Sequence, residues 1–292
     1  MIAIVSLTWK ELLRKRVTLM TIIMSVIFWI ALWFISGAIT GNQTGIVDES
    51  SIYALIDRFQ QSAIILSLGF FFGAFAIAFL AIFSSVAAVS GEAEHGVLQS
   101  VLARPLPRWK WFLGRWLGFT VFGIAYSLLM FISIILITWM QTGLLLEINI
   151  LLKSFLLFTS VVPLLVSLTM LGSCWLSPLG NGIGMTMLFG MGWLGSMINR
   201  VMGTRLIHED GMETLETITG IITLIMPADS LQQRMLAELF SVANFAGTFD
   251  LGGVFTVVSL TSPPSNLYLV YATLYTLLAI IAGLWVMKRK NF

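Results

Sequence analysis

The sequence predicts an all-α polytopic membrane protein with six transmembrane helices. Two observations lead to this fold class. Of the 292 residues, 58% are hydrophobic and only 10% are charged, with a mean hydropathy of +0.95, which exceeds what a water-soluble domain of this size normally carries. In addition, six stretches approach the roughly 20 apolar residues that a helix needs to cross a hydrocarbon core of about 30 Å.

Each predicted span is a long apolar run between more polar segments. The run after Arg16 is too long for the hydrophobic part of a signal peptide and lacks a small-residue cleavage pattern, so we expect a retained helix there. The fifth run is rich in glycine, and "TSPPSN" breaks the chain before the sixth. The spans are expected at about 17–40, 62–90, 112–140, 154–176, 181–198 and 266–287, within one transmembrane domain that covers residues 1–292.

The charge distribution predicts the orientation of these spans. If the N-terminus is cytosolic and the spans alternate, the inside segments hold 11 of the 16 basic residues and the outside segments hold 11 of the 14 acidic residues. Because cytosolic loops are enriched in lysine and arginine, both termini and the segment 91–111 are predicted to be cytosolic. The basic residues on that side are Lys10, Arg14, Lys15, Arg16, Arg104, Arg108, Lys110, Arg115, Lys288, Arg289 and Lys290.

Among aspartate, glutamate, lysine, arginine and histidine, the one residue within the predicted spans is Arg115, about one turn into the third span. We expect its long side chain to extend to the cytosolic surface. A proton-coupled transporter usually carries an ionisable group at membrane depth, so the lack of others counts against that class.

Residues 199–265 between the fifth and sixth spans are predicted to form a partly helical extracytoplasmic region. "METLETITGIITLIM" has an acidic start that suits a helix N-terminus. "PADSLQQRMLAELF" offers Asp229 or Ser230 as an N-cap and places Leu231, Met235 and Leu239 on one helical face. These helices are expected either to lie on the outer membrane surface or to cap a passage.

The sequence gives no support for an enzyme. There is no G-x-x-x-x-G-K-[ST] loop, so the chain is not expected to bind and hydrolyse ATP itself. His95 and His208 are predicted on opposite sides of the membrane, and the lone Cys174 is expected to be a small buried residue. No catalytic residue, metal site, cofactor or nucleic-acid partner is therefore predicted for this chain.

The segment "SGEAEHGVLQSVLARPLPRWK", residues 90–110, is the most polar long stretch in the first half of the chain. Glu92 and Glu94 are two residues apart and would point to different faces of a helix. After Gly96, a short amphipathic helix is expected, and Arg104-Pro105 would end it. Its apolar stripe is formed by Val97, Leu98, Val101 and Leu102. On these features alone, an ordinary interfacial loop without a partner is an equally good interpretation.

This segment also resembles the one that follows the second helix in membrane subunits of type 2 ABC transporters. That pattern runs roughly E-x-E-x-G-x-L, then apolar residues, then R-P and a basic turn. The resemblance extends to "WKELLRKR", to "MPADSL" and to the basic end "KRKNF", and it is closest to the permease group that serves nitrous-oxide reductase maturation. The matching residues are Glu92, Glu94, Gly96, Leu98, Arg104, Pro105 and Arg108.

The resemblance implies a permease of the cell membrane, an exporter, that is driven by a separate ATPase docked on the cytosolic helix. Glu92, Glu94 and Arg108 would lie at the ATPase contact, Gly96 would allow the turn into the coupling helix, and Arg104 with Pro105 would end it. Two ATPase copies would carry the ATP and Mg, and a second permease subunit would complete a homodimer or heterodimer. No substrate-binding residue is predicted.

Two other classes of function stay open at this point. A membrane assembly or sensor subunit would use the outer region 199–265 as its working part. A secondary transporter or channel would need a selectivity element inside the spans, for which the glycine-rich fifth span is the available candidate.

Overall fold

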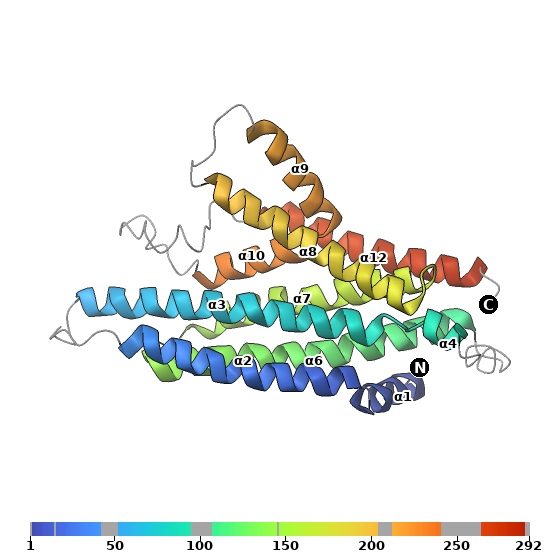
Figure 1. Cartoon of the computed structure of the whole chain (residues 1–292), viewed down its shortest axis with the longest axis horizontal. Coiled ribbons are helices and arrows are strands. Elements are labelled where there is room, and N and C mark those ends of the chain that lie inside the picture. Colours follow the sequence, from blue (N-terminus) through green and yellow to red (C-terminus); the bar gives the residue numbers. More distant parts are fainter. Residues whose placement is uncertain are drawn as a thin grey trace.

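The computed structural model describes residues 2–14, 16–41, 52–94, 107–144, 146–203, 212–240 and 264–289. The regular elements in these ranges are α-helices, and the long ones run along the length of one bundle (Figure 1). In chain order they are α1 (Ile2–Arg14), α2 (Arg16–Gly41), α3 (Ile52–Ser85), α4 (Ser90–Glu94), α6 (Arg108–Thr142), α7 (Ile148–Ser173), α8 (Pro178–Gly203), α9 (Met212–Ile225), α10 (Ala228–Phe240) and α12 (Asn266–Arg289).

A helix covers most of each of the six segments that were predicted to span the membrane. Among the described residues, five stretches are long and apolar enough to cross a bilayer: α2, α3 continued to Glu94, α6, α7 and α12. Helix α8 covers the predicted fifth span but is not one of these five, because glycine and asparagine residues dilute its hydrophobicity. At 34 and 35 residues, α3 and α6 are each about 50 Å long, so they extend well beyond the hydrocarbon core.

Helix α2 turns its small hydroxyl residues inward and its large apolar residues outward. Thr18, Thr21 and Ser25 are buried, whereas Met20 and Phe34 are 67% and 72% exposed. The Ser25 hydroxyl lies 2.6 Å from the Tyr126 hydroxyl of α6, and this hydrogen bond joins the two helices. The arrangement is the reverse of a helix on a water-soluble protein and is typical of helices that pack against one another in lipid.

The centre of the bundle is an aromatic core between α3, α6 and α7. The ring of Phe70 lies 5.2 Å from the rings of both Phe131 and Phe158. Beside it, Ile134 of α6 fills the space left by Gly69 on α3, where an added Cβ would come within 2.7 Å of the isoleucine. This glycine lets the two helix backbones approach closely.

Helix α10 is an internal element of the bundle. Leu231, Met235 and Leu239 are buried on one face, as predicted. The side-chain amide of Gln232 donates to the Phe70 carbonyl at 3.1 Å, which ties α10 to the middle of α3. These contacts exclude a position of α10 on the outer surface.

The start of α10 differs slightly from the prediction. The Pro227 carbonyl accepts the first helical hydrogen bond, from the Leu231 amide at 3.1 Å. Pro227 therefore occupies the N-cap position, and Asp229 and Ser230 lie in the first turn. The acidic side chain still lies where the helix dipole favours negative charge.

Helix α9 ends against a row of tyrosines on α12. The hydroxyls of Tyr268, Tyr271 and Tyr275 donate to the carbonyls of Thr223, Leu224 and Ile225 at 2.8, 2.6 and 3.0 Å. The last carbonyls of an α-helix have no partner within the helix. The three tyrosines supply these partners from α12.

Candidate functional site

One end of the bundle collects charged side chains from helices that are far apart in the sequence. The starts of α2 and α6, the end of α12, and helices α1 and α4 all lie there (Figure 1). We call this the basic end and the opposite one the far end. The described basic residues on these elements are Lys10, Arg14, Arg16, Arg108, Lys110, Arg115, Lys288 and Arg289.

Arg115 lies at the centre of the basic end. Its side chain is 4% exposed and forms ion pairs with two carboxylates, Glu11 of α1 and Glu92 of α4. It also donates to the Thr8 hydroxyl of α1 at 3.3 Å. One guanidinium therefore connects three helices, and its planar fork of donors suits this double contact better than a lysine would.

Buried in this way, Arg115 does not extend to the surface, so that expectation from the sequence is wrong. The two carboxylates take the place of water around the guanidinium, which makes burial of the charge possible. The guanidinium carbon also lies 5.7 Å from the centre of the Phe119 ring, a cation–π arrangement. Glu11 and Glu92 remain partly accessible, at 34% and 15% exposure, so the site lies at the edge of the bundle.

Helix α1 is held against the start of α6 by close packing as well as by charge. Ile4 and Thr8 fill the space above Gly114 and Gly118, where added Cβ atoms would come within 2.9 and 2.7 Å of them. Both glycines belong to a G-x-x-x-G spacing, which here serves contact with α1. Helix α1 is therefore a packed part of the basic end.

The end of α12 closes the other side of the basic end. The Arg108 guanidinium donates to the Met287 carbonyl at 3.4 Å. One turn further along α6, the ring of Phe112 fills the space left by Gly283 of α12. These contacts fix the first turns of α6 between α1 and α12.

Three of the predicted docking residues lie in the described part of the chain. Glu92 and Glu94 point to different faces of α4, as expected from their spacing: Glu92 pairs with Arg115 and Glu94 is exposed. Arg108 is the first residue of α6 and binds the end of α12. The remaining four, Gly96, Leu98, Arg104 and Pro105, lie outside the described residues.

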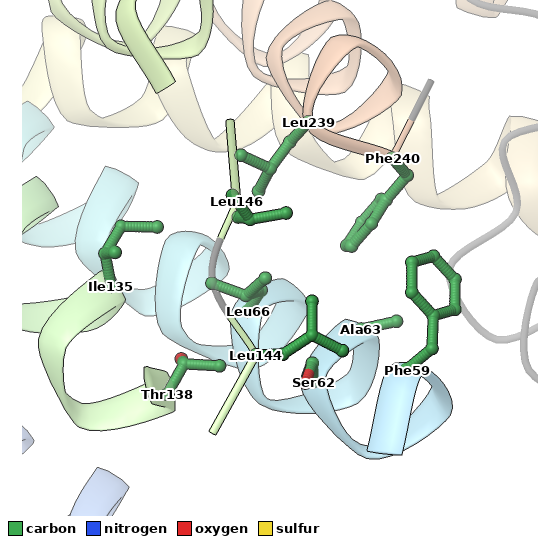
Figure 2. A pocket seen from close by; sticks show the side chains of 10 residues that line it. All are labelled: Phe59, Ser62, Ala63, Leu66, Ile135, Thr138, Leu144, Leu146, Leu239 and Phe240. Atoms are coloured by element: carbon green, nitrogen blue, oxygen red, sulfur yellow. The ribbon is translucent and has the colours of Figure 1, made fainter. Parts of the chain in front are cut away.

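A cavity at the far end is a second candidate site. Figure 2 shows the side chains that line it, from α3, α6, α10 and the segment after α6, nearly all of them apolar. The volume that the centre of a water molecule can occupy in this cavity is only about 20 Å³, which is enough for about one water. Its two hydroxyls, of Ser62 and Thr138, already donate to carbonyls in their own helices. The cavity is therefore too small and too apolar to serve as a site for a transported molecule.

In the part of the chain that the structure describes, no group of three or more histidine, cysteine, aspartate or glutamate side chains could hold a metal ion. Cys174 is buried, as its place in the sequence predicts. The chemistry of the basic end is therefore that of ion pairs and hydrogen bonds between helices.

The family model described as "ABC-2 family transporter protein" matches residues 2–292, nearly the whole chain. The chain belongs to the ABC-2 family. It is thus a multi-pass membrane permease subunit of an ABC transporter, as the resemblance in residues 90–110 implied. No curated protein matches the sequence significantly.

ABC-2 permeases normally lack the catalytic ATPase and pair with a separate ABC ATPase subunit. In transporters of this family, the source of energy is normally the ATPase subunit. An ABC-2 permease needs a surface that receives the movement of that ATPase. Among the described residues, the basic end is the place where several helices are joined by buried charge.

Proposed function

We propose that this ABC-2 permease is an exporter subunit driven by an ABC ATPase that docks on the segment 91–108. The observation that carries the proposal is the double ion pair of Arg115. It ties α4, from which the segment leaves, to α6, where the segment ends, and braces both with α1. A push on the segment would therefore move three helices together.

The polarity of the bundle supports a cytosolic basic end. Eight described basic residues lie on its elements, and lysine and arginine are enriched on the cytosolic side of membrane proteins. On this assignment both termini are cytosolic, α8 is the fifth of six spans, and residues 199–265 belong to the extracytoplasmic side of one transmembrane domain.

The complex is proposed to contain two permease subunits, identical or different, and two ATPase subunits that carry ATP and Mg. In this arrangement Glu94, exposed at the end of α4, is a direct contact of the ATPase. Glu92 acts through Arg115. Gly96, Leu98, Arg104 and Pro105 form the coupling helix and its ends, and Arg108 fixes the return of the chain into α6. The group that serves nitrous-oxide reductase maturation is the proposed subgroup.

Copurification tests this docking surface. The tagged permease is purified from its native membranes, and the ABC ATPase that it retains is measured. Glu94→Lys combined with Leu98→Asp should reduce retention at least about tenfold, which corresponds to a loss of about 1.4 kcal/mol in binding. The matched control is Glu147→Lys, which reverses an exposed charge at the far end and should retain the ATPase.

Two outcomes would contradict the proposal. If the wild-type permease retains no ATPase, the chain is better explained as an assembly or sensor subunit or as a secondary transporter. If the double variant retains as much ATPase as the control, the ATPase docks elsewhere on the permease.

A further inference from the structure

Helices α3 and α4 are separated by a turn at residues 86–89. The turn reads Val86, Ala87, Ala88, Val89, without proline or glycine. The two alanines favour a helix, whereas the β-branched Val86 and Val89 favour it less. The Ser84 and Ser85 hydroxyls just before the turn donate to the Ala81 carbonyl at 3.2 and 2.7 Å, a local contact that bends helices, and contacts from α7 and α8 add to it.

A serine of α7 accepts hydrogen bonds from two backbone amides at the break. The Val89 and Ser90 amides donate to the Ser173 hydroxyl oxygen at 2.9 and 3.1 Å. In a continuous helix these amides would donate to the carbonyls of residues 85 and 86. Instead, the Ser85 carbonyl accepts from the Ala88 amide at 3.0 Å, in a tighter turn. Ser173 thus replaces two hydrogen bonds of the helix.

An asparagine of α8 donates a hydrogen bond to a backbone carbonyl at the break. The Asn181 side-chain amide donates to the Val86 carbonyl at 2.9 Å and to the Thr169 carbonyl of α7 at the same distance. Asn181 is fully buried. Its carboxamide fits because residue 172 is a glycine, since a Cβ added at Gly172 would overlap the Asn181 oxygen. The break is therefore satisfied by α7 and α8 together.

We propose that Ser173 and Asn181 are positioning residues of the transport cycle and that this region has two hydrogen-bonding states. In the state seen here, the two side chains stabilise the break between α3 and α4. In the second state the Val89 and Ser90 amides return to the carbonyls of residues 85 and 86, and α3 runs on through α4 as one helix. The inference rests on the proposed function, because α4 leads directly into the segment assigned to ATPase docking.

The two states place the docking segment differently. Glu92 lies just beyond the break, so straightening the helix changes the direction in which its carboxylate points relative to Arg115. A displacement of α4 by the ATPase is thus passed on in two directions: through Glu92 and Arg115 to α6 and α1, and through Ser173 and Asn181 to α7 and α8. In the continuous helix the Val89 and Ser90 amides have helical carbonyls as partners, so no backbone group is left unpaired, whereas the Ser173 hydroxyl and the Asn181 amide give up their contacts with the break.

Double electron–electron resonance on the permease alone tests this inference. Spin labels are attached at Glu94→Cys in α4 and Leu267→Cys at the far end of α12, both exposed positions, with Cys174→Ala to remove the single native cysteine. Ser173→Ala with Asn181→Leu should shift the distance between the labels by about one helical turn, on the order of 5 Å.

Ser167→Ala is the matched control. It removes a buried hydroxyl from the same helix, which accepts a hydrogen bond from the Trp116 indole at 2.9 Å, but it does not touch the break. Its distance distribution should equal that of the wild type. Gly172→Ala is a second test variant. It leaves the residues Ser173 and Asn181 unchanged, but its added methyl group displaces the Asn181 carboxamide. The distance between the labels should shift in the same direction as in the double variant.

The outcomes separate this inference from the docking proposal. A shift in the double variant and in Gly172→Ala, with none in Ser167→Ala, supports the two states. A wild-type distribution in Gly172→Ala and in the double variant overturns them, even if the permease retains its ATPase. If the double variant does not fold, the distribution of Gly172→Ala decides. A shift without ATPase retention in the copurification experiment contradicts the docking proposal and leaves the two states standing.

Discussion

Arg115→Met should lower the melting temperature of the permease by on the order of 5–10 °C. The substitution leaves Glu11 and Glu92 close together at the edge of the bundle without their shared cation. Removing one partner of a buried ion pair costs about 3–5 kcal/mol. Thermal unfolding of the detergent-purified protein, followed by tryptophan fluorescence, measures the effect. Because α1 and α4 are both released, the N-terminal helix should also become accessible to trypsin.

A triple variant separates the loss of charge pairing from the loss of packing. Arg115→Met combined with Glu11→Gln and Glu92→Gln removes all three charges, and replacing a whole buried ion pair by neutral groups is often nearly neutral for stability. The triple variant should therefore recover most of the melting temperature. If Arg115→Met alone melts with the wild type, the ion pairs do not hold the basic end together.

Replacing Tyr268, Tyr271 and Tyr275 together by phenylalanine is the second change expected to have a large effect. Each substitution keeps the ring but leaves a carbonyl at the end of α9 without its donor. Two of the three hydrogen bonds are exposed, so each is expected to contribute about 0.5–1.5 kcal/mol and the triple variant should lose about 2–4 kcal/mol in total. The expected result is a lower melting temperature and faster proteolysis between α8 and α12.

Tyr126→Phe is the matched control for the tyrosine row. It also removes a hydroxyl between two helices, but its partner Ser25 keeps a second hydrogen bond, to the Thr21 carbonyl at 2.7 Å. The control should therefore lose at most about 1 kcal/mol. Equal stability of the triple variant and the control would mean that water or lipid headgroups satisfy the end of α9.

The apolar runs predicted most of the helices, because a membrane helix is specified locally by about 20 consecutive residues of one kind. The helix with Leu231, Met235 and Leu239 on one face was also predictable from its periodicity. Helix α1 was not predicted, because its 13 residues mix charged and apolar side chains and the segment was interpreted only as a basic flank of the first span. Its amphipathic pattern, with Thr8 and Leu12 buried on one face, is the signal that would have found it.

The contacts between helices at the basic end could not be predicted from local sequence patterns. Arg115 is 104 residues from Glu11 in the sequence, and no periodicity connects them. The turn before α4 contains neither proline nor glycine, and its contacts with Ser173 and Asn181 are visible only in the structure. Glu92 was predicted to contact the ATPase from its place in a pattern, but the side chain itself turns inward to Arg115. Exposed Glu94 remains the better probe of a partner.

Site-specific photo-cross-linking tests the central claim most directly. A benzophenone amino acid replaces exposed Glu94 at the basic end or, as the matched control, exposed Glu147 at the far end, and each permease is irradiated in membranes together with its ATPase. The account predicts a cross-linked product that contains the ATPase from position 94 and none from position 147. Capture of the ATPase from position 147, or from neither position while it still copurifies, would contradict docking at the basic end.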